Sequence, residues 1–229
     1  MAAHLSYWEK VNFYRSDVII VGSGIVGLTA AIAIKKQQPN ISVTVLERGF
    51  LPSGASTKNA GFACFGSISE LIEQEKICGT DGLHALIKKR WLGLQKLRSL
   101  VGDAKLELQI NGGFELFKKE NGSLTAECVS KISHYNHLIK DITQETGVFN
   151  TSAEKLESFG FGKISCLISN KLEGQLDPGK MIKALLEIAS SLGISILNTC
   201  EVTAFEEKEN EQVVFSSQGN FSTKKLLCC

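Results

Sequence analysis

The sequence predicts an α/β fold in which a smaller, mainly antiparallel β region is inserted into a Rossmann-like nucleotide-binding domain. The apolar run after Asp17 leads into Gly-x-Gly-x-x-Gly at residues 22–27, and an amphipathic stretch follows. A second apolar run, residues 41–46, ends in Glu47, about twenty residues beyond the last glycine of the motif. From Leu106 onward the apolar residues alternate, which is typical of half-buried strands.

Each glycine of the motif meets a different geometric need. Gly22 allows a sharp turn out of the first strand, and Gly24 lets a pyrophosphate approach the backbone closely. Gly27 allows the following helix to pack tightly on the strand. The start of that helix offers unpaired N–H groups and the positive end of its dipole to phosphates. We therefore count Ile25 and Val26 with the three glycines as cofactor-binding residues.

Glu47 ends the second predicted strand, where its carboxylate can accept hydrogen bonds from ribose hydroxyls. The same negative charge would repel a 2′-phosphate, which disfavours NADP. Arg48 follows directly and is included in the predicted cofactor site. The glycine motif and the acid suit NAD as well as FAD, so they leave the choice of dinucleotide open.

Composition limits the classes of protein to be considered. The chain has 229 residues, which suits one large domain or two interleaved ones, and its apolar fraction of 43% is sufficient for a core. A formal net charge of +1 gives no electrostatic reason to expect nucleic acid or an anionic membrane as a partner. Residues 18–34 are apolar, but their spaced glycines and the strand behind them argue against a signal peptide or membrane span.

The seven cysteines are scattered, with no Cys-x-x-Cys pair and no Cys/His cluster at zinc spacing. Free thiols in a reducing cytoplasm fit this pattern, and we expect no metal site. His134 and His137 lie three residues apart on a predicted helix, but no third ligand accompanies them, so we interpret them as surface histidines. His84 is interpreted as a surface or capping residue.

The other elements follow from the spacing of apolar residues. Residues 1–16 form a polar and aromatic lead-in, and we expect Tyr7, Trp8 and Phe13 to pack on the domain surface. The first helix runs from about Gly24 to Gln37. Its expected apolar face comprises Val26, Ala30, Ala33 and Ile34. Further helices are predicted over residues 81–100, 124–145 and 179–191, and strands over residues 106–110, 114–117, 163–168, 194–197, 212–216 and 221–229.

A loop rich in small and hydroxyl residues, residues 51–67, follows the second strand. Its backbone N–H groups and hydroxyls can lie against a large planar ligand with a polar tail. A solvated surface loop would explain Ser53 and Gly54, but it would expose Phe62 and Phe65 at a cost in burial free energy. We therefore interpret this loop as part of a ligand site.

Three stretches together resemble the D-amino-acid-oxidase-like FAD-dependent oxidoreductases, a group that includes glycine oxidase and sarcosine oxidase. They are Gly-Ser-Gly-Ile-Val-Gly, Leu-Glu-Arg and Gly-Ala-Ser-Thr-Lys-Asn-Ala-Gly-Phe. The resemblance implies FAD as cofactor, with Glu47 at the adenosine ribose. It also implies a loop around the pyrophosphate, ribityl chain and flavin edge, formed by Ser56, Thr57, Asn59, Ala60 and Gly61. Many members carry Arg where this chain has Lys58, so an anion contact there would be less directional.

The resemblance also implies a division into domains. The first part of the FAD-binding domain is expected at residues 1–104, a partial substrate-capping domain at 105–170, and the second part of the FAD-binding domain at 171–229. Within the last part, Gly-x-x-Asp-Pro at residues 174–178 marks the return to the FAD-binding domain. Val202 matches a segment whose backbone contacts the adenine.

The last residues, 226–229, read as a strand that is cut off within a sheet. The resemblance covers nearly all of this chain but only the front part of the family pattern, so we expect a fragment of a longer enzyme. The family often holds the substrate carboxylate in its later part. No catalytic residue is therefore assigned.

The resemblance implies an enzyme that oxidises an amine or amino acid by hydride transfer to flavin, with oxygen or a quinone as electron acceptor. One alternative is an NAD-dependent oxidoreductase, which would not need the loop at residues 56–61. Another is a non-catalytic nucleotide-binding fragment. A redox-disulfide flavoprotein is disfavoured, because Cys64 lies in the flavin-facing loop without a cysteine close in sequence. We expect Cys64 to pack rather than to form a covalent link to flavin.

Overall fold

The computed structural model describes residues 6–229, and the chain divides into two compact units. Unit 1 comprises Met1–Ala60 and Pro178–Cys229, and unit 2 comprises Gly61–Asp177. The boundaries expected from the sequence, after residues 104 and 170, stay a prediction about functional domains. Among the described residues, unit 1 has one sheet and unit 2 has two, and the units are described separately.

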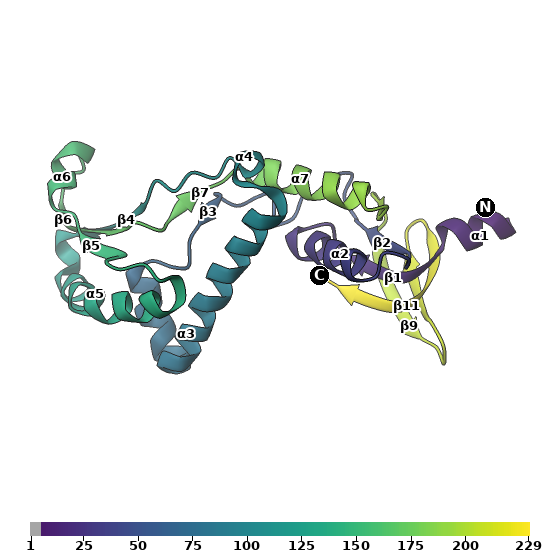
Figure 1. Cartoon of the computed structure of the whole chain (residues 1–229), viewed down its shortest axis with the longest axis horizontal. Coiled ribbons are helices and arrows are strands. Elements are labelled where there is room, and N and C mark those ends of the chain that lie inside the picture. Colours follow the sequence, from purple (N-terminus) through teal and green to yellow (C-terminus); the bar gives the residue numbers. More distant parts are fainter. Residues whose placement is uncertain (1–5) are drawn as a thin grey trace. The chain divides into compact units, whose positions relative to one another are not determined.

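Unit 1 contains a six-stranded sheet with the order β8-β2-β1-β11-β10-β9. The parallel strands are β1 (Arg15–Val21), β2 (Val43–Leu46), β8 (Ser195–Leu197) and β11 (Gly219–Cys228). The antiparallel extension consists of β10 (Gln212–Ser216) and β9 (Val202–Glu207). Strands β1 and β11 lie side by side although almost 200 residues separate them (Figure 1). The predicted Rossmann-like α/β fold class is confirmed.

Helices α2 (Ile25–Gln37) and α7 (Pro178–Ser191) pack against each other in unit 1. The predicted apolar face of α2 is partly wrong, because Val26 is 62% exposed and Ala33 is also exposed. The buried residues are instead Gly27, Leu28, Ala31 and Ile32. Apolar residues occupy nearly the whole circumference of this helix, so spacing alone could not select the face that meets the sheet.

A short helix, α1 (Tyr7–Phe13), precedes the sheet and was not predicted. Ser6 and Glu9 form a capping box at its start, with the Ser6 hydroxyl accepting from the Glu9 N–H and the Glu9 carboxylate accepting from the Ser6 N–H. The expected packing of the aromatic residues is wrong, since Tyr7 is 69% exposed and Trp8 is 71% exposed. This short helix has no buried residue, so within the described residues no other element covers these aromatic side chains.

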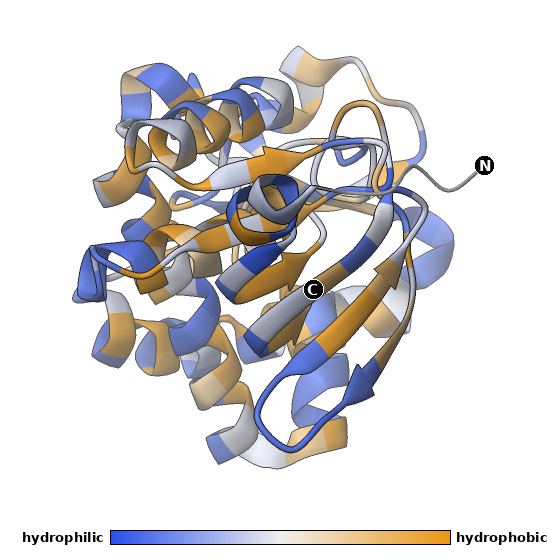
Figure 2. Ribbon diagram, turned by 90° about the vertical axis from the view of Figure 1, so that its right-hand side faces the viewer, coloured by the Kyte–Doolittle hydropathy of each residue, from blue (hydrophilic) through white to orange (hydrophobic). Residues whose placement is uncertain are grey.

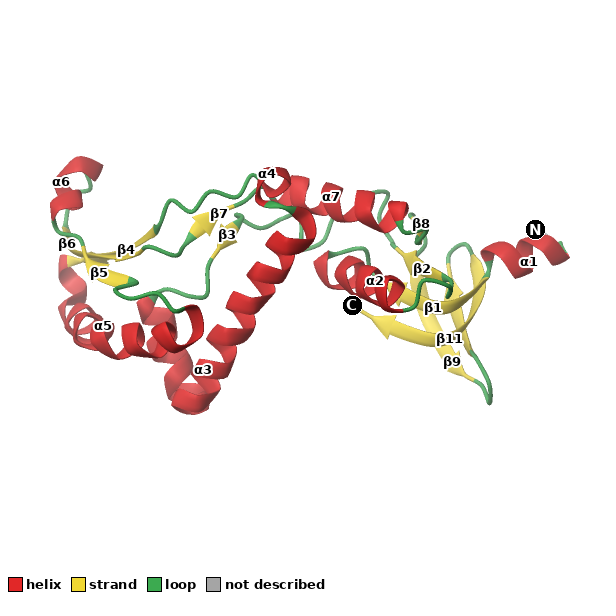
Figure 3. Cartoon of the chain, viewed as in Figure 1, coloured by secondary structure: helices red, strands yellow, loops and turns green. Residues whose placement is uncertain are grey.

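Unit 2 is built on a three-stranded antiparallel sheet of β4 (Gly113–Lys118), β6 (Ile164–Asn170) and β5 (Phe149–Thr151), with β6 in the centre. Helix α5 (Gly122–Thr143) packs on this sheet and on α3 (Ile68–Val101), as Figure 3 shows. The unit also contains α4 (Asp103–Leu106), the 3-10 turn η1 (Lys119–Asn121), α6 (Glu154–Phe159) and the short pair β3 (Phe62–Ala63) and β7 (Gly174–Gln175). Its core includes Phe65, Leu83, Ile87, Tyr135 and Phe149.

Helix α3 begins thirteen residues before the predicted helix, at Ile68 rather than Asp81. Gly79 interrupts it with φ of 70° and ψ of 173°, so the chain forms two helical segments. The predicted strand over residues 106–110 is wrong. Leu106 ends α4, and beyond it only Gln109 makes an isolated bridge, to Gln175. The apolar residues alternate along this segment, but Leu106 is buried whereas Ile110 is exposed. No described strand pairs with the segment along its length, so the pattern did not produce a strand.

Figure 2 shows that the helices carry both hydrophobic and hydrophilic residues, as expected for helices packed on one side of a core. The end of β9 and the turn into β10 are strongly hydrophilic, with four glutamates in residues 206–211. Within residues 6–229, every helix is too short or too polar to cross a lipid bilayer.

Candidate nucleotide-binding site

The glycine turn joins β1 to α2 at the carboxyl end of the parallel strands. Gly22 has φ of +99°, and its N–H donates to the Leu46 carbonyl at 2.8 Å, which ties the turn to β2. A Cβ on Gly27 would lie 1.9 Å from the Gly22 carbonyl oxygen, so only glycine fits where α2 passes the turn. A Cβ on Gly24 would lie 3.0 Å from the Ser56 Oγ and would fill the space beside the helix start. The turn therefore leaves an open cradle of backbone.

The start of α2 presents donors to this cradle. Gly24 is the N-cap residue and supplies no side-chain cap. The Ile25 N–H donates to the Ser56 Oγ at 2.9 Å. Within residues 6–229, the Val26 and Gly27 N–H groups reach no protein acceptor. These two donors, at the positive end of the helix dipole, suit a phosphate.

Glu47 lies directly after β2 and is only 7% exposed. Its Oε2 accepts hydrogen bonds from the Ser23 N–H at 2.9 Å and from the Ser23 Oγ at 2.7 Å. Its Oε1 accepts one bond, from the Gly49 N–H at 2.9 Å. Because a carboxylate oxygen accepts about two hydrogen bonds, Oε2 is fully used and Oε1 can accept one more. The Oε1 atom of Glu47 is therefore the one that can accept a hydrogen bond from a ligand.

These contacts also fix the charge state of Glu47. Burial alone would raise the pKa of this carboxyl group, but the hydrogen bonds from Ser23 and Gly49 favour the ionised form and hold its pKa below the usual value. Glu47 is therefore a carboxylate at neutral pH. It can accept a hydrogen bond from a hydroxyl, and it repels a phosphate.

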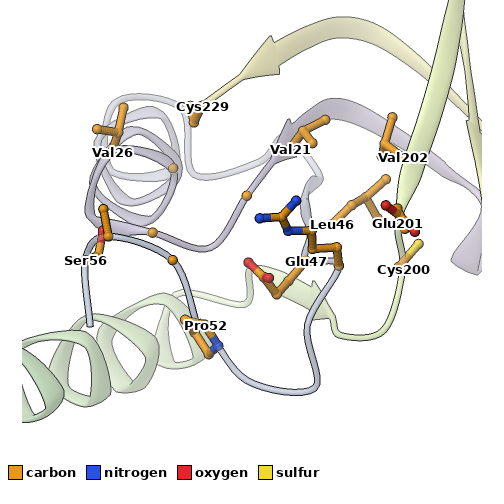
Figure 4. A pocket seen from close by; sticks show the side chains of 16 residues that line it. Val21, Val26, Leu46, Glu47, Pro52, Ser56, Cys200, Glu201, Val202 and Cys229 are labelled. Carbon is orange, nitrogen blue, oxygen red and sulfur yellow. The ribbon is translucent and has the colours of Figure 1, made fainter. Parts of the chain in front are cut away.

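Backbone hydrogen bonds hold the segment of residues 197–202 beside Glu47. The Glu47 N–H donates to the Leu197 carbonyl at 2.8 Å, and the Cys200 N–H donates to the Glu47 carbonyl at 2.8 Å. The parallel pairing of β8 with β2 sets these bonds. Cys200, Glu201 and Val202 consequently border the same space as Glu47 (Figure 4).

A pocket of about 500 Å³ lies among these segments. Figure 4 shows Ser56 at the start of α2 on one side, residues 200–202 on the other, and Glu47 between them. The predicted site residues that line the pocket are Gly22, Gly24, Val26, Gly27, Glu47, Arg48, Ser56 and Val202. The predicted residues outside the lining are Ile25, Thr57, Asn59, Ala60 and Gly61. Pro52, Gly54 and Ala55 also line the pocket and belong to the loop of residues 51–67 that the sequence placed in a ligand site. The lining residues that sequence reasoning missed are Val21, Leu46, Cys200, Glu201 and Cys229.

The loop after β2 is held largely by its own contacts. The Thr57 hydroxyl donates to the Pro52 carbonyl at 3.0 Å, and the Asn59 amide donates to the Ala55 carbonyl at 3.0 Å. Ala60 and Lys58 are exposed, whereas Gly61 is buried with φ of +76°. The sequence argument expected Phe62 and Phe65 to be buried; Phe65 is buried, but Phe62 is 71% exposed, so the expectation is wrong for Phe62. The side chains of Thr57 and Asn59 thus shape the loop, and its Ser56 hydroxyl touches the helix start.

Of the histidines considered in the sequence, His134 has a structural partner. The His134 Nε2 lies 2.9 Å from the Glu75 Oε1, which ties α5 to α3. Within the described residues, no group of three possible metal ligands occurs. Cys64 is exposed, so the expectation that it packs is wrong. Partial burial of its thiol still raises the pKa, and the negative charge of Glu173 raises it further, so the reactive thiolate form is disfavoured.

Comparison with known proteins adds a family and a set of folds. The family model described as FAD dependent oxidoreductase matches residues 17–229. The bifunctional protein ThiO/ThiG of Synechocystis is 26% identical over 213 residues, which are 90% of this chain and 28% of that protein. The FAD-dependent oxidoreductase domain-containing protein 1 of Bos taurus is 27% identical over 201 residues, which are 83% of this chain and 38% of that protein.

Solved structures of similar fold include glycine oxidase from Geobacillus kaustophilus, with a TM-score of 0.66 and 20% identity over 94% of this chain and 55% of that one. L-Amino acid deaminase from Proteus myxofaciens gives a TM-score of 0.65 and 20% identity over 94% of this chain and 45% of that one. The chain therefore spans about a third of the curated relatives' length and about half of the length of these structures.

Proposed function

The chain belongs to the family of FAD-dependent oxidoreductases, and we propose that unit 1 binds FAD in the pocket bordered by Glu47. The observation that carries this proposal is the Glu47 carboxylate. Ser23 holds one of its oxygens, and the other can accept one more hydrogen bond beside the start of α2. This donor and acceptor arrangement fits a ribose hydroxyl next to a pyrophosphate.

The predicted residues divide into three groups in this proposal. Glu47 accepts a hydrogen bond from the adenosine ribose, with Arg48 beside it. The backbone of residues 22–27 cradles the pyrophosphate. The loop of Ser56, Thr57, Asn59, Ala60 and Gly61 lies along the rest of the cofactor, and the backbone of Val202 contacts the adenine. No residue of this chain is assigned as catalytic.

We propose an amine or amino acid as the substrate, oxidised with oxygen or a quinone as the final acceptor. When bound, FAD supplies the acceptor for the substrate's hydride. Glycine oxidase and L-amino acid deaminase support this class, because their folds resemble that of the chain. The seven cysteines are free, which suits the reducing cytoplasm that we propose as its compartment.

The first test is direct binding of FAD to the whole chain, measured by flavin absorption and by quenching of flavin fluorescence. We expect Gly24→Ala to weaken FAD binding by about tenfold or more, because a methyl group there fills the cradle. The backbone of Gly24 has φ of −72°, which alanine adopts easily, so the fold should be retained.

Gly93→Ala provides the matched control, since its Cβ would meet nothing within 4 Å. It should leave FAD affinity unchanged. Equal FAD binding by the wild-type chain and Gly24→Ala would contradict the proposed cradle. Binding of NAD in place of FAD would favour the NAD-dependent alternative.

The substrate class is tested separately, by adding amines and amino acids to the FAD-loaded chain without oxygen. Bleaching of the flavin absorption would support the proposed reaction, and reoxidation by oxygen or by a soluble quinone would identify the acceptor class. Stable FAD binding with no bleaching by any amine or amino acid would instead favour a non-catalytic nucleotide-binding role.

A further inference from the structure

A second pocket, of about 410 Å³, lies within unit 2 beside β4 and β7, whose places Figure 3 shows. Four aromatic side chains line it, namely Phe62, Phe114, Phe159 and Phe161. Among its described lining residues, Glu173 alone carries a charge. The pocket thus combines an apolar wall with one acid, and nothing in the proposed flavin site uses it.

Glu173 is half-buried and lacks a partner among the described residues. Within residues 6–229, its carboxylate makes no hydrogen bond and no ion pair. The carboxylate lies against Gly113, where a Cβ would come 2.4 Å from the Oε2, so a side chain at that position would displace it. Burial raises the pKa of Glu173, and the negative charge of Glu115 raises it further. A cation in the pocket would offset both effects.

The aromatic wall is suited to a cation as well. The rings of Phe114 and Phe159 meet edge to face, with centroids 5.2 Å apart. The ammonium of Lys155 lies 4.6 Å from the centroid of Phe114, within the range of a cation–π contact. One face of this ring therefore already attracts a positive charge in the structure.

A smaller cavity, of about 130 Å³, shares Gly113, Phe114 and Glu173 with this pocket and is also lined by Asn170. Asn170 is 3% exposed, and its Nδ2 has no hydrogen-bond partner. A buried amide donor without a partner costs free energy unless a ligand or water oxygen meets it. A second polar group without a protein partner therefore adjoins Glu173.

We propose that the pocket of unit 2 binds a small organic cation, whose ammonium group lies at Glu173 and whose apolar body lies on the phenylalanine rings. A free carboxylate on the ligand is disfavoured, because Glu173 and Glu115 would both repel it. The proposal is independent of FAD binding, since all of its residues lie in unit 2.

The test uses three probes of similar shape with the whole chain at about pH 8, where amines are charged. They are 2-phenylethylamine, its neutral analogue 2-phenylethanol, and phenylalanine, which adds a carboxylate. Binding is measured by calorimetry and by saturation-transfer NMR. We expect 2-phenylethylamine to bind about tenfold or more tightly than either of the others.

Two variants are expected to change amine binding in opposite directions. Misfolding could only weaken binding, so it cannot explain both results. Glu173→Gln should weaken the binding of 2-phenylethylamine by about tenfold or more, because it removes the negative charge and keeps the shape. Lys155→Ala should strengthen it two- to threefold, because it removes a competing positive charge from Phe114. Glu120→Gln, at an exposed site of the same unit, should change nothing.

Equal affinity for the amine and the alcohol would overturn the proposal, because the pocket would then recognise only apolar surface. Unchanged amine binding by Glu173→Gln would do the same. Flavin absorption is recorded for each protein, so a failure of this proposal is distinguishable from a failure of FAD binding.

Discussion

Asp17 joins three segments of unit 1 through one carboxylate. Its Oδ1 accepts from the Lys224 ammonium at 2.8 Å, and its Oδ2 accepts from the Ser42 N–H at 2.8 Å. The bond from Lys224, followed by the bonds from Ser42, lowers the pKa of Asp17 from 3.8 to about 2. The residue therefore ties the starts of β1 and β2 to β11.

We expect Asp17→Asn to lower the free energy of unfolding by about 1 kcal/mol at neutral pH, a value reduced for the partial exposure of the pair. The pKa is lower in the folded state, so the contribution is present above about pH 4 and is lost as pH falls toward 2. Urea unfolding of both proteins across this range measures it. Asp141→Asn, at an exposed site, should have no such effect, and a loss at neutral pH that persisted unchanged at pH 2 would contradict the assignment.

The residues of the candidate site differ in how far the sequence could predict them. Gly22, Gly27 and Glu47 were predictable, because each meets a local need of one strand–turn–helix–strand unit. Cys200 and Glu201 were not, because they reach the pocket only through the pairing of β8 with β2. That pairing depends on long-range contacts, which residue spacing does not encode.

At the scale of elements, α3 shows the limit of helical periodicity. The stripe of Leu83, Ile87 and Leu97 was predictable and is buried. The segment before Gly79 was missed because a glycine, a threonine and an aspartate follow one another there and read as a break. The break is real, since Gly79 has φ of 70°, but a second helical segment precedes it.

Two glycines of α3 provide a matched pair. We expect Gly79→Ala to destabilise unit 2 by about 1–2 kcal/mol, because alanine is strained at positive φ. Gly93 lies in regular helix, and a Cβ there would meet open space. Because alanine has a higher helix propensity than glycine, Gly93→Ala should stabilise the unit by about 0.5–1 kcal/mol. Thermal unfolding of the two variants measures both values. The same sign for both would show that α3 is continuous at Gly79 in solution.

At the scale of the whole molecule, the fold class and the parallel strands near the glycine turn were predictable, whereas the membership of each unit was not. Unit 1 consists of two chain segments that more than a hundred residues separate. The segments share one core, in which Ile19 and Leu46 of the first segment contact Val214 and Phe221 of the second. Neither segment can bury these core side chains alone. We therefore expect the backbone amides of both segments to lose their protection from hydrogen exchange together.

Hydrogen exchange tests this with one large core residue from each unit. Phe221 is 2% exposed and stacks on Tyr14 with ring centroids 4.8 Å apart, and Phe149 is 1% exposed in the core of unit 2. Replacing either by alanine should cost about 3–5 kcal/mol. Phe221→Ala should speed exchange in residues 6–60 and 178–229, and Phe149→Ala should speed it in residues 61–177. If either variant accelerated exchange equally along the whole chain, the two units would unfold as one, and the independent cores would carry no separate stability.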